Sequence, residues 1–202
     1  MLPTKIPGKP NLEFRLLEEK DYTDLQIFCD YWKSKSIKNN DSFQSIKLDK
    51  MKMPYGQYFI GYDYDKKIIW NLAGVHQLPE IGNHAWRCLF RGAQLPGYSM
   101  GKSLTTDFFK SGYQMSYVID WQVKYILNYD PDAEFYTSTN NLKNKEHFSR
   151  SQFLDQIAMP KMEERSVFTR VHDNFELYNT KQSIWKLNID QYYIERKKSI
   201  NY

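Results

Sequence analysis

Three successive strand-like segments in the first half of the chain restrict the possible folds more than any other feature. Residues 57–63 and 68–75 are dominated by apolar, aromatic and β-branched side chains, and the polar tetrapeptide 64–67 between them is typical of a hairpin turn. A third segment of this kind, 84–91, follows residues 79–83, whose Gly and Asn suit a second turn. The sequence therefore predicts an antiparallel meander of three strands.

Segments with helical periodicity lie on both sides of this meander. After Asp21, a suitable N-cap residue, apolar side chains recur at helical spacing as far as Trp32. A longer helix is predicted over 115–128, and another over 140–153, which the chain must leave at Pro160. Further strands are predicted at 12–17, 133–139, 167–171 and 183–187.

This order of strands and helices indicates an α+β protein with a central mixed, mostly antiparallel sheet flanked by helices. The length of 202 residues suits one compact domain with extensions. We expect an extended arm over 1–11, the domain over 12–188, and a charged tail over 189–202 that has some helical character.

Composition removes several classes of protein. The mean hydropathy is −0.71, and no run approaches the roughly 18 apolar residues of a membrane helix. The N-terminus also lacks the apolar core of a secretory signal, so we expect a cytoplasmic protein with no membrane segment. Cys29 and Cys88 each lie in an apolar stretch without a CxxC partner, which indicates buried free thiols. The abundance of Lys, Asn, Ile and Tyr is typical of an AT-rich genome, such as that of a phage.

The charge gives little support for a nucleic-acid partner. Lys and Arg number 28 against 24 Asp and Glu, and the surplus of +4 is spread along the whole chain. Aromatic residues alternate with lysines over 173–186, but at this charge the segment is better explained as a buried hairpin with a solvated lysine edge than as a stacking surface for bases. We therefore expect no nucleic acid as a partner.

The spacing of residues argues against two further kinds of site, a Walker A nucleotide-binding loop and a metal site. Residues 97–103 end in Gly-Lys-Ser, but only three residues separate the glycines where a Walker A loop needs four. The four histidines are scattered, with no pair at metal-ligand spacing, so no metal site is expected.

The element order and several local stretches resemble the fold of the GCN5-related N-acetyltransferases. The likeness covers RLLEEKDYTDLQIF at 15–28, which is similar to the first strand and helix of that family. It continues in QYFIGYDYDKKIIWNLAGV at 57–75, which is similar to the second and third strands. In the second half, Asn141, Phe148 and Phe153 have the spacing of an Asn, a Tyr and an aromatic residue that often follow the fifth strand of the family.

The resemblance implies acetyl-CoA as a co-substrate and assigns it a place. In the family the fourth and fifth strands, here 84–91 and 133–139, are parallel neighbours that splay apart and hold the pantetheine arm like an added strand. The pyrophosphate lies on the N-terminus of the next helix. The residues implied to bind the cofactor are Cys88, Leu89, Phe90, Ser111, Gly112, Tyr113, Gln114, Asn141 and Phe148.

Two departures from the family keep two functions open. The glycine-rich pyrophosphate signature is missing from 111–117, and Phe148 replaces the Tyr that reprotonates the departing thiolate in many members. One hypothesis is an N-acetyltransferase that acts on an amine of a small molecule or protein. The alternative is a catalytically inactive binding or structural module of the same fold, with 1–11 and 189–202 free to reach a protein partner. The sequence specifies neither the acceptor nor the oligomeric state.

An active enzyme needs a base that removes a proton from the acceptor ammonium. His76 and His84 flank the turn between the third and fourth strands, where the acceptor would approach, and a histidine titrates near neutral pH. Glu80 in the same turn is the carboxylate alternative. We take His76, Glu80 and His84 as the candidate catalytic residues.

Overall fold

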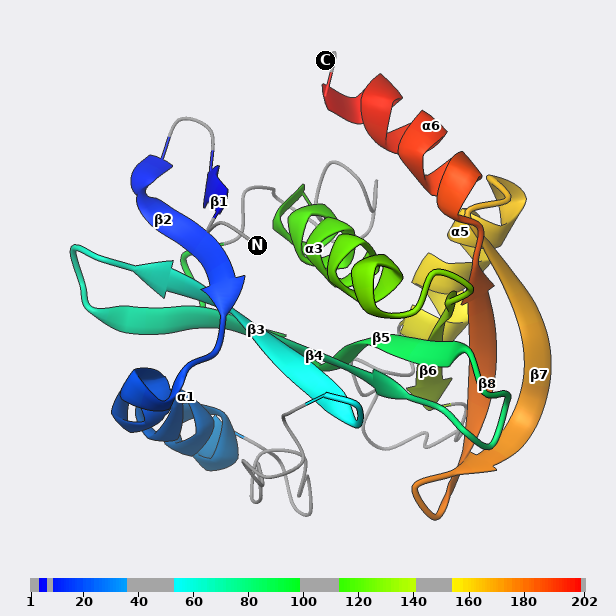
Figure 1. Cartoon of the computed structure of the whole chain (residues 1–202), viewed down its shortest axis with the longest axis horizontal. Coiled ribbons are helices and arrows are strands. Elements are labelled where there is room, and N and C mark those ends of the chain that lie inside the picture. The colour runs from blue at the N-terminus through cyan, green and yellow to red at the C-terminus, as the bar shows by residue number, and fades with distance from the viewer. Residues whose placement is uncertain (1–3, 7–8, 36–52, 99–112, 141–153, 201–202) are drawn as a thin grey trace.

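A single mixed sheet of eight strands forms the centre of the protein (Figure 1). The computed structural model describes residues 4–6, 9–35, 53–98, 113–140 and 154–200. The strand bounds are Thr4–Ile6 (β1), Lys9–Leu16 (β2), Gly56–Asp63 (β3), Ile68–Gln77 (β4), Ala85–Gln94 (β5), Glu134–Asn140 (β6), Phe168–Leu177 (β7) and Thr180–Leu187 (β8). The spatial order is β1-β2-β3-β4-β5-β6-β8-β7. Every neighbouring pair is antiparallel except β5 and β6, which run parallel, so the α+β prediction is confirmed.

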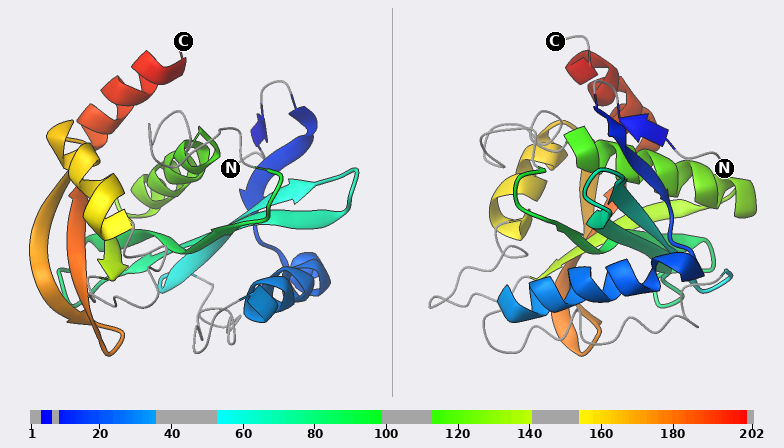
Figure 2. Two further views of the ribbon diagram at one scale, coloured as in Figure 1. Left: turned by 180° about the vertical axis from the view of Figure 1, so that it is seen from behind. Right: turned by 90° about the vertical axis from the view of Figure 1, so that its left-hand side faces the viewer.

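Helices cover both faces of this sheet (Figures 1 and 2). A short 3-10 turn, η1 (Glu19–Asp21), leads into α1 (Tyr22–Lys35) on one face, and α3 (Tyr113–Tyr129) crosses the other. A π-helical turn, η4 (Leu154–Ala158), precedes α5 (Met159–Glu164), and α6 (Ile189–Ile200) follows β8. The larger core lies on the α3 side, where helical side chains meet strand residues such as Trp86, Phe135 and Trp185. A second core joins α1 to β3 and β4.

The β3–β4 hairpin forms where the polar tetrapeptide predicted it. Asp63 and Ile68 are the last paired residues on either side of the turn. One carboxylate oxygen of Asp63 accepts hydrogen bonds from the backbone N–H groups of Asp65 and Lys66, each at 3.0 Å, which fixes the start of the turn. The turn is completed by Lys67, whose φ of 54° lies in the left-handed region.

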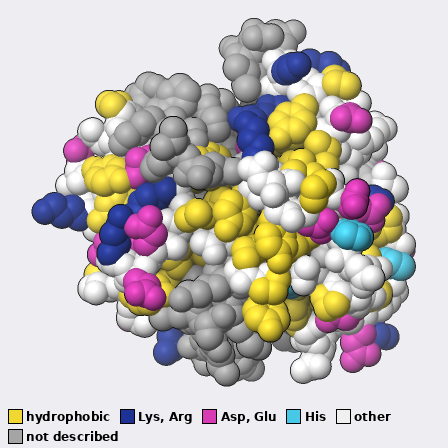
Figure 3. Space-filling model, viewed as in Figure 1, with side chains coloured by type: hydrophobic (Ala, Val, Ile, Leu, Met, Phe, Trp, Pro, Cys, Tyr) yellow, Lys and Arg dark blue, Asp and Glu magenta, His cyan; other side chains and the backbone are white. Residues whose placement is uncertain are grey.

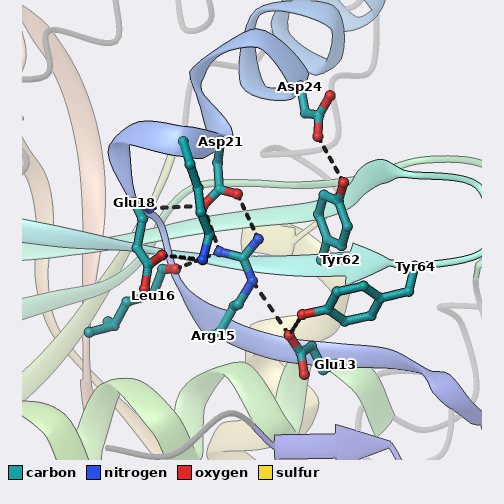
Figure 4. Close-up of polar contacts among 9 residues, drawn as sticks. Glu13, Arg15, Leu16, Glu18, Asp21, Asp24, Tyr62 and Tyr64 are labelled. Atoms are coloured by element: carbon teal, nitrogen blue, oxygen red, sulfur yellow. Dashed lines mark hydrogen bonds and ion pairs between the residues drawn. The ribbon is translucent and has the colours of Figure 1, made fainter.

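A buried ionic cluster attaches α1 to β2 (Figure 4). The guanidinium of Arg15 donates two hydrogen bonds, of 2.5 and 2.6 Å, to the two carboxylate oxygens of Asp21. Glu13 lies 3.5 Å from Arg15 and accepts a hydrogen bond from the Tyr64 hydroxyl. Burial alone would raise the pKa of Asp21, but the hydrogen bonds from Arg15 and from the Glu18 N–H lower it below its usual value. These charges can be buried because each has a partner.

The structure differs from the sequence-based expectations at three points. Strand structure begins before Leu12, since β1 and the first residues of β2 lie inside the expected arm 1–11. Pro160 lies in the first turn of α5 instead of ending a helix. A proline is tolerated in a first turn because the N–H that it lacks would have no partner within the helix there. The tail has the expected helical character, as α6, but an ion pair between Arg196 and Asp120 attaches it to α3 instead of leaving it free to reach a partner. Most of the helix predicted over 140–153 lies outside the described residues.

Both cysteines are buried free thiols, as the sequence indicated. Among the helices that the structure describes, none combines the length and the apolar character that crossing a bilayer requires. On the face shown in Figure 3, lysine and arginine side chains of the described residues are interspersed with acidic ones and do not gather in one patch.

Candidate functional site

The two parallel strands diverge soon after they begin. β5 and β6 pair at three positions, Ala85 with Glu134, Trp86 with Phe135, and Arg87 with Tyr136. β5 then continues to Gln94 and β6 to Asn140, and within the described residues no further pair joins them. The strands predicted at 84–91 and 133–139 are therefore neighbours that splay apart, as the resemblance implied. Their separated edges expose backbone groups to which an extended chain of amides can bind.

A β-bulge reshapes β5 where the divergence starts. Opposite β4, the pairs His76–Arg87 and Gly74–Phe90 leave three steps on β5 against two on β4, and Leu89 has a φ of 57°. The side chain of Gln122, which is fully buried in α3, secures this bulge. Its carbonyl accepts the Leu89 N–H at 3.1 Å, and its amide donates to the carbonyl of Gly74 at 2.9 Å. The backbone conformation at the divergence is thus fixed from the α3 side.

A row of polar side chains crosses the opposite face at the last paired position. Sheet register places His76, Arg87, Tyr136 and Lys186 side by side on four successive strands. Their chain neighbours Val75, Trp86, Phe135 and Trp185 belong to the core under α3, so the row faces the other side of the sheet. We call these four residues the polar row.

His76 is held at both ring nitrogens. Nδ1 lies 2.6 Å from the carbonyl oxygen of Gln77, to which it donates, and Nε2 lies 2.5 Å from the hydroxyl of Tyr178, from which it accepts. Tyr178 lies in the β7–β8 turn with a φ of 54°, a left-handed conformation that is uncommon for a large residue. The guanidinium of Arg87 lies 4.9 Å from the centre of the Tyr178 ring. A histidine and a hydroxyl can therefore exchange a proton beside the diverging strands.

The other half of the polar row is an ionic cluster. Glu134 accepts hydrogen bonds of 2.6 Å from the Lys186 ammonium and from the Tyr136 hydroxyl. The bond from Lys186, followed by that from Tyr136, lowers the pKa of Glu134. Burial, followed by the bond to Glu134, raises the pKa of Tyr136. Tyr136 is thus a neutral donor near the divergence.

The three candidate bases do not form one cluster. Only His76 lies in the polar row. His84 is exposed and lies 2.8 Å from Asp130, which also accepts a hydrogen bond from the Trp86 indole on the α3 side. The bond to Asp130 raises the pKa of His84. Glu80 is exposed in the turn after β4.

The residues implied to bind the cofactor fall into three groups. The first group, Cys88, Leu89 and Phe90, lies in β5 beyond the last pair with β6. Burial raises the pKa of the Cys88 thiol, so this side chain stays protonated. Tyr113 and Gln114 form the start of α3, where a helix N-terminus was expected, and their side chains lie outside the description. The residues outside the described part of the chain are Ser111, Gly112, Asn141 and Phe148.

Sequence reasoning missed Gln122, Arg87 and Tyr178. A signal for Gln122 was present, because it is a polar residue in the middle of the apolar face that Val118 and Ile126 share. Nothing local marks Tyr178, since its contact with His76 spans 102 positions. In the described residues, no three His, Cys, Asp or Glu side chains group as metal ligands would.

Solved structures of acetyltransferases share this fold. Ribosomal-protein-S5-alanine acetyltransferase from Vibrio fischeri aligns with a TM-score of 0.56 at 12% identity over 95% of this chain and 99% of its own. An acyl-CoA N-acyltransferase from Pseudomonas aeruginosa gives 0.54 at 9% identity over 88% and 99%. A GNAT-family acetyltransferase from Staphylococcus aureus gives 0.52 at 12% identity over 88% and 99%. No family model and no curated protein sequence matches the chain. The fold is GNAT-like, as the sequence resemblance implied, and these identities carry the likeness no further than the fold.

Proposed function

We propose that the protein is a cytoplasmic N-acetyltransferase that transfers the acetyl group of acetyl-CoA to an amine of a small molecule or protein. The observation that carries the proposal is the divergence of β5 from β6 after three pairs, together with the bulge at Leu89. This geometry leaves strand edges that suit the amides of the pantetheine arm. In the reaction the amine nitrogen forms a bond to the thioester carbonyl carbon, the carbon–sulfur bond breaks, and a proton leaves the nitrogen.

The chain supplies backbone groups for both parts of acetyl-CoA. Beyond Arg87 β5 has no described pair with β6, so its edge suits the pantetheine amides, and Gln122, which accepts the Leu89 N–H, holds this edge in place. The N–H groups in the first turn of α3, from Tyr113, suit the pyrophosphate because a helix N-terminus favours an anion. Ser111, Gly112 and Asn141 complete the proposed binding residues from outside the described ranges.

Proton removal is assigned to His76 acting through Tyr178. Both ring nitrogens of His76 are engaged, so its imidazole reaches an acceptor only through the Tyr178 hydroxyl. When the Tyr178 proton moves to Nε2, the phenolate oxygen takes the proton of the acceptor ammonium, and the Arg87 guanidinium stabilises the transient negative charge. Glu80 and His84 stay as alternative bases, and each lacks this link to the polar row.

The test combines binding and turnover. Millimolar acetyl-CoA should raise the melting temperature, because a ligand of the native state stabilises it by RT ln(1 + [L]/Kd). Release of free CoA thiol with a panel of amines then reports turnover. An unchanged melting temperature in the presence of acetyl-CoA would contradict the proposal. Stabilisation without thiol release from any amine would instead support the inactive binding module, for which the missing glycine-rich signature argues.

A further inference from the structure

A cavity lies away from the diverging strands, where α1 meets the start of β4 and the segment after β5. Its volume is about 420 Å³, within the range of small-molecule sites. Its walls include Ile27 and Phe28 from α1, Ile69 from the start of β4, and Leu95 and Tyr98 from just beyond β5. Three separate parts of the chain thus build one mostly apolar cavity.

The cavity is separate from the proposed acetyl-transfer site. Ile69 lines the cavity and His76 belongs to the polar row, and the two positions are seven residues apart on the same strand. At about 3.3 Å per residue, this separates them by roughly 23 Å. A molecule in the cavity would not contact His76 and Tyr178, so a ligand of the cavity is considered separately from the substrates of the proposed acetyl transfer.

One carboxylate gives the apolar cavity a charge preference. Asp24, in the first turn of α1, lines the cavity and is half-buried. Its Oδ2 accepts a hydrogen bond of 3.0 Å from the Tyr62 hydroxyl, as Figure 4 shows. Among the described residues, no hydrogen bond reaches its other oxygen, Oδ1. A partly desolvated carboxylate oxygen beside apolar walls favours a cationic donor.

The cavity is also lined by one positively charged residue, Lys66, which is more exposed than Asp24. Lys66 is exposed in the β3–β4 turn, and its ammonium lies 4.9 Å from the centre of the Tyr98 ring. Solvent screens this charge more strongly than that of Asp24. An apolar wall is also exposed, since Ile27 keeps 58% of its surface accessible on an otherwise amphipathic helix. The cavity therefore offers apolar contact together with one anionic anchor.

From these observations we infer that the cavity is a binding site for a monocationic amine with an aliphatic or aromatic body, its ammonium on Asp24 and its body against Ile27 and Ile69. This site is independent of the proposed acetyl transfer. The aromatic ring of Tyr31 on the cavity wall suits such a ligand, because a cation and an aromatic face attract each other.

The experiment titrates the full chain, without acetyl-CoA, with three probes of one shape: phenethylammonium, 2-phenylethanol and 3-phenylpropanoate. Methyl NMR should show shifts at Ile27 and Ile69, with phenethylammonium binding about tenfold more tightly than the alcohol. Asp24→Asn should remove this preference. Asp30→Asn is the matched control, because Asp30 is an exposed carboxylate on the same helix that does not line the cavity.

A second variant guards against loss of fold. Ile27→Ser changes an exposed side chain and should weaken phenethylammonium and the alcohol by a similar factor. Equal affinity for all three probes, tighter binding of the carboxylate, no binding of phenethylammonium at millimolar concentration, or an unchanged preference in Asp24→Asn would each overturn the inference.

Discussion

The ionic cluster at Arg15 and the polar row at His76 use the same kinds of side chain in opposite ways. Around Arg15, the guanidinium and the carboxylates of Asp21 and Glu13 are buried and paired with one another, with Asp21 only 3% exposed, and the exposed Tyr64 donates a hydrogen bond to Glu13. Around His76, a guanidinium, a histidine and a tyrosine lie at diverging strands, and Tyr178 is 46% exposed.

The contrast separates a structural role from a chemical one. Buried charges must satisfy each other, because an unpaired buried charge is very costly, and this leaves them no capacity for a substrate. Beside the polar row, Tyr178 is an exposed residue whose hydroxyl bonds to His76 and has capacity for a further hydrogen bond to a ligand. Exposure next to unpaired strand edges, more than residue type, identifies the candidate site.

The largest expected effect is on the buried cluster. Arg15→Met leaves the carboxylates of Asp21 and Glu13 without their cation, so unfolding free energy should fall by about 3–5 kcal/mol. Urea denaturation measures it. Lys20→Met is the control, because Lys20 and Glu18 form an exposed pair that solvent screens, so its loss should change stability little. Similar losses in both variants would break the comparison.

The next effect is on catalysis. Tyr178→Phe removes the hydroxyl that links His76 to the acceptor, so the rate of thiol release should fall about a hundredfold or more with little change in acetyl-CoA affinity. Steady-state kinetics and a binding titration measure the two quantities. Tyr55→Phe, at a tyrosine that is 68% exposed, should leave both unchanged. Full activity of Tyr178→Phe would remove the relay from the mechanism.

A smaller effect is expected where the α3 side supports the site. Gln122→Leu leaves the Leu89 N–H and the Gly74 carbonyl without their buried partner, which should cost about 1–3 kcal/mol of stability and weaken acetyl-CoA binding. Thermal melts with and without acetyl-CoA report both. Gln26→Leu, on the exposed face of α1, should change neither. If Gln122→Leu lost stability but bound acetyl-CoA normally, the bulge would have no part in binding.

The smallest effect sharpens the comparison through pH. The bond to Asp130 raises the pKa of His84 above its ordinary 6.5. The stability from this pair is therefore present below that ordinary value and is lost as the pH rises through the raised one. As the pH rises from 6, the melting temperature of the wild type should fall more than that of His84→Gln. The difference should be small, since His84 is exposed. Parallel pH profiles of the two proteins would show that the pair contributes nothing.

Local patterns were sufficient to predict much of the fold. The hairpin at 64–67 and the helix at 115–128 appear as expected, because turn residues and periodicity act over a few positions. The resemblance also placed 84–91 beside 133–139. Local pattern failed at Pro160, which is tolerated at a helix start as well as excluded from a helix interior.

The sequence by itself determined most of the segments that form strands and helices and which of their faces are apolar, because these follow from the spacing of side chains along a short stretch. Only the tertiary structure decided which polar groups meet. The bond of Tyr178 to His76 and the alignment of the polar row depend on strand order and register, which bring residues as far apart as 102 positions together. The two hydrogen bonds from Arg15 to Asp21 likewise depend on how η1 is placed relative to β2. These contacts arise when the chain packs its core, and no local pattern encodes them.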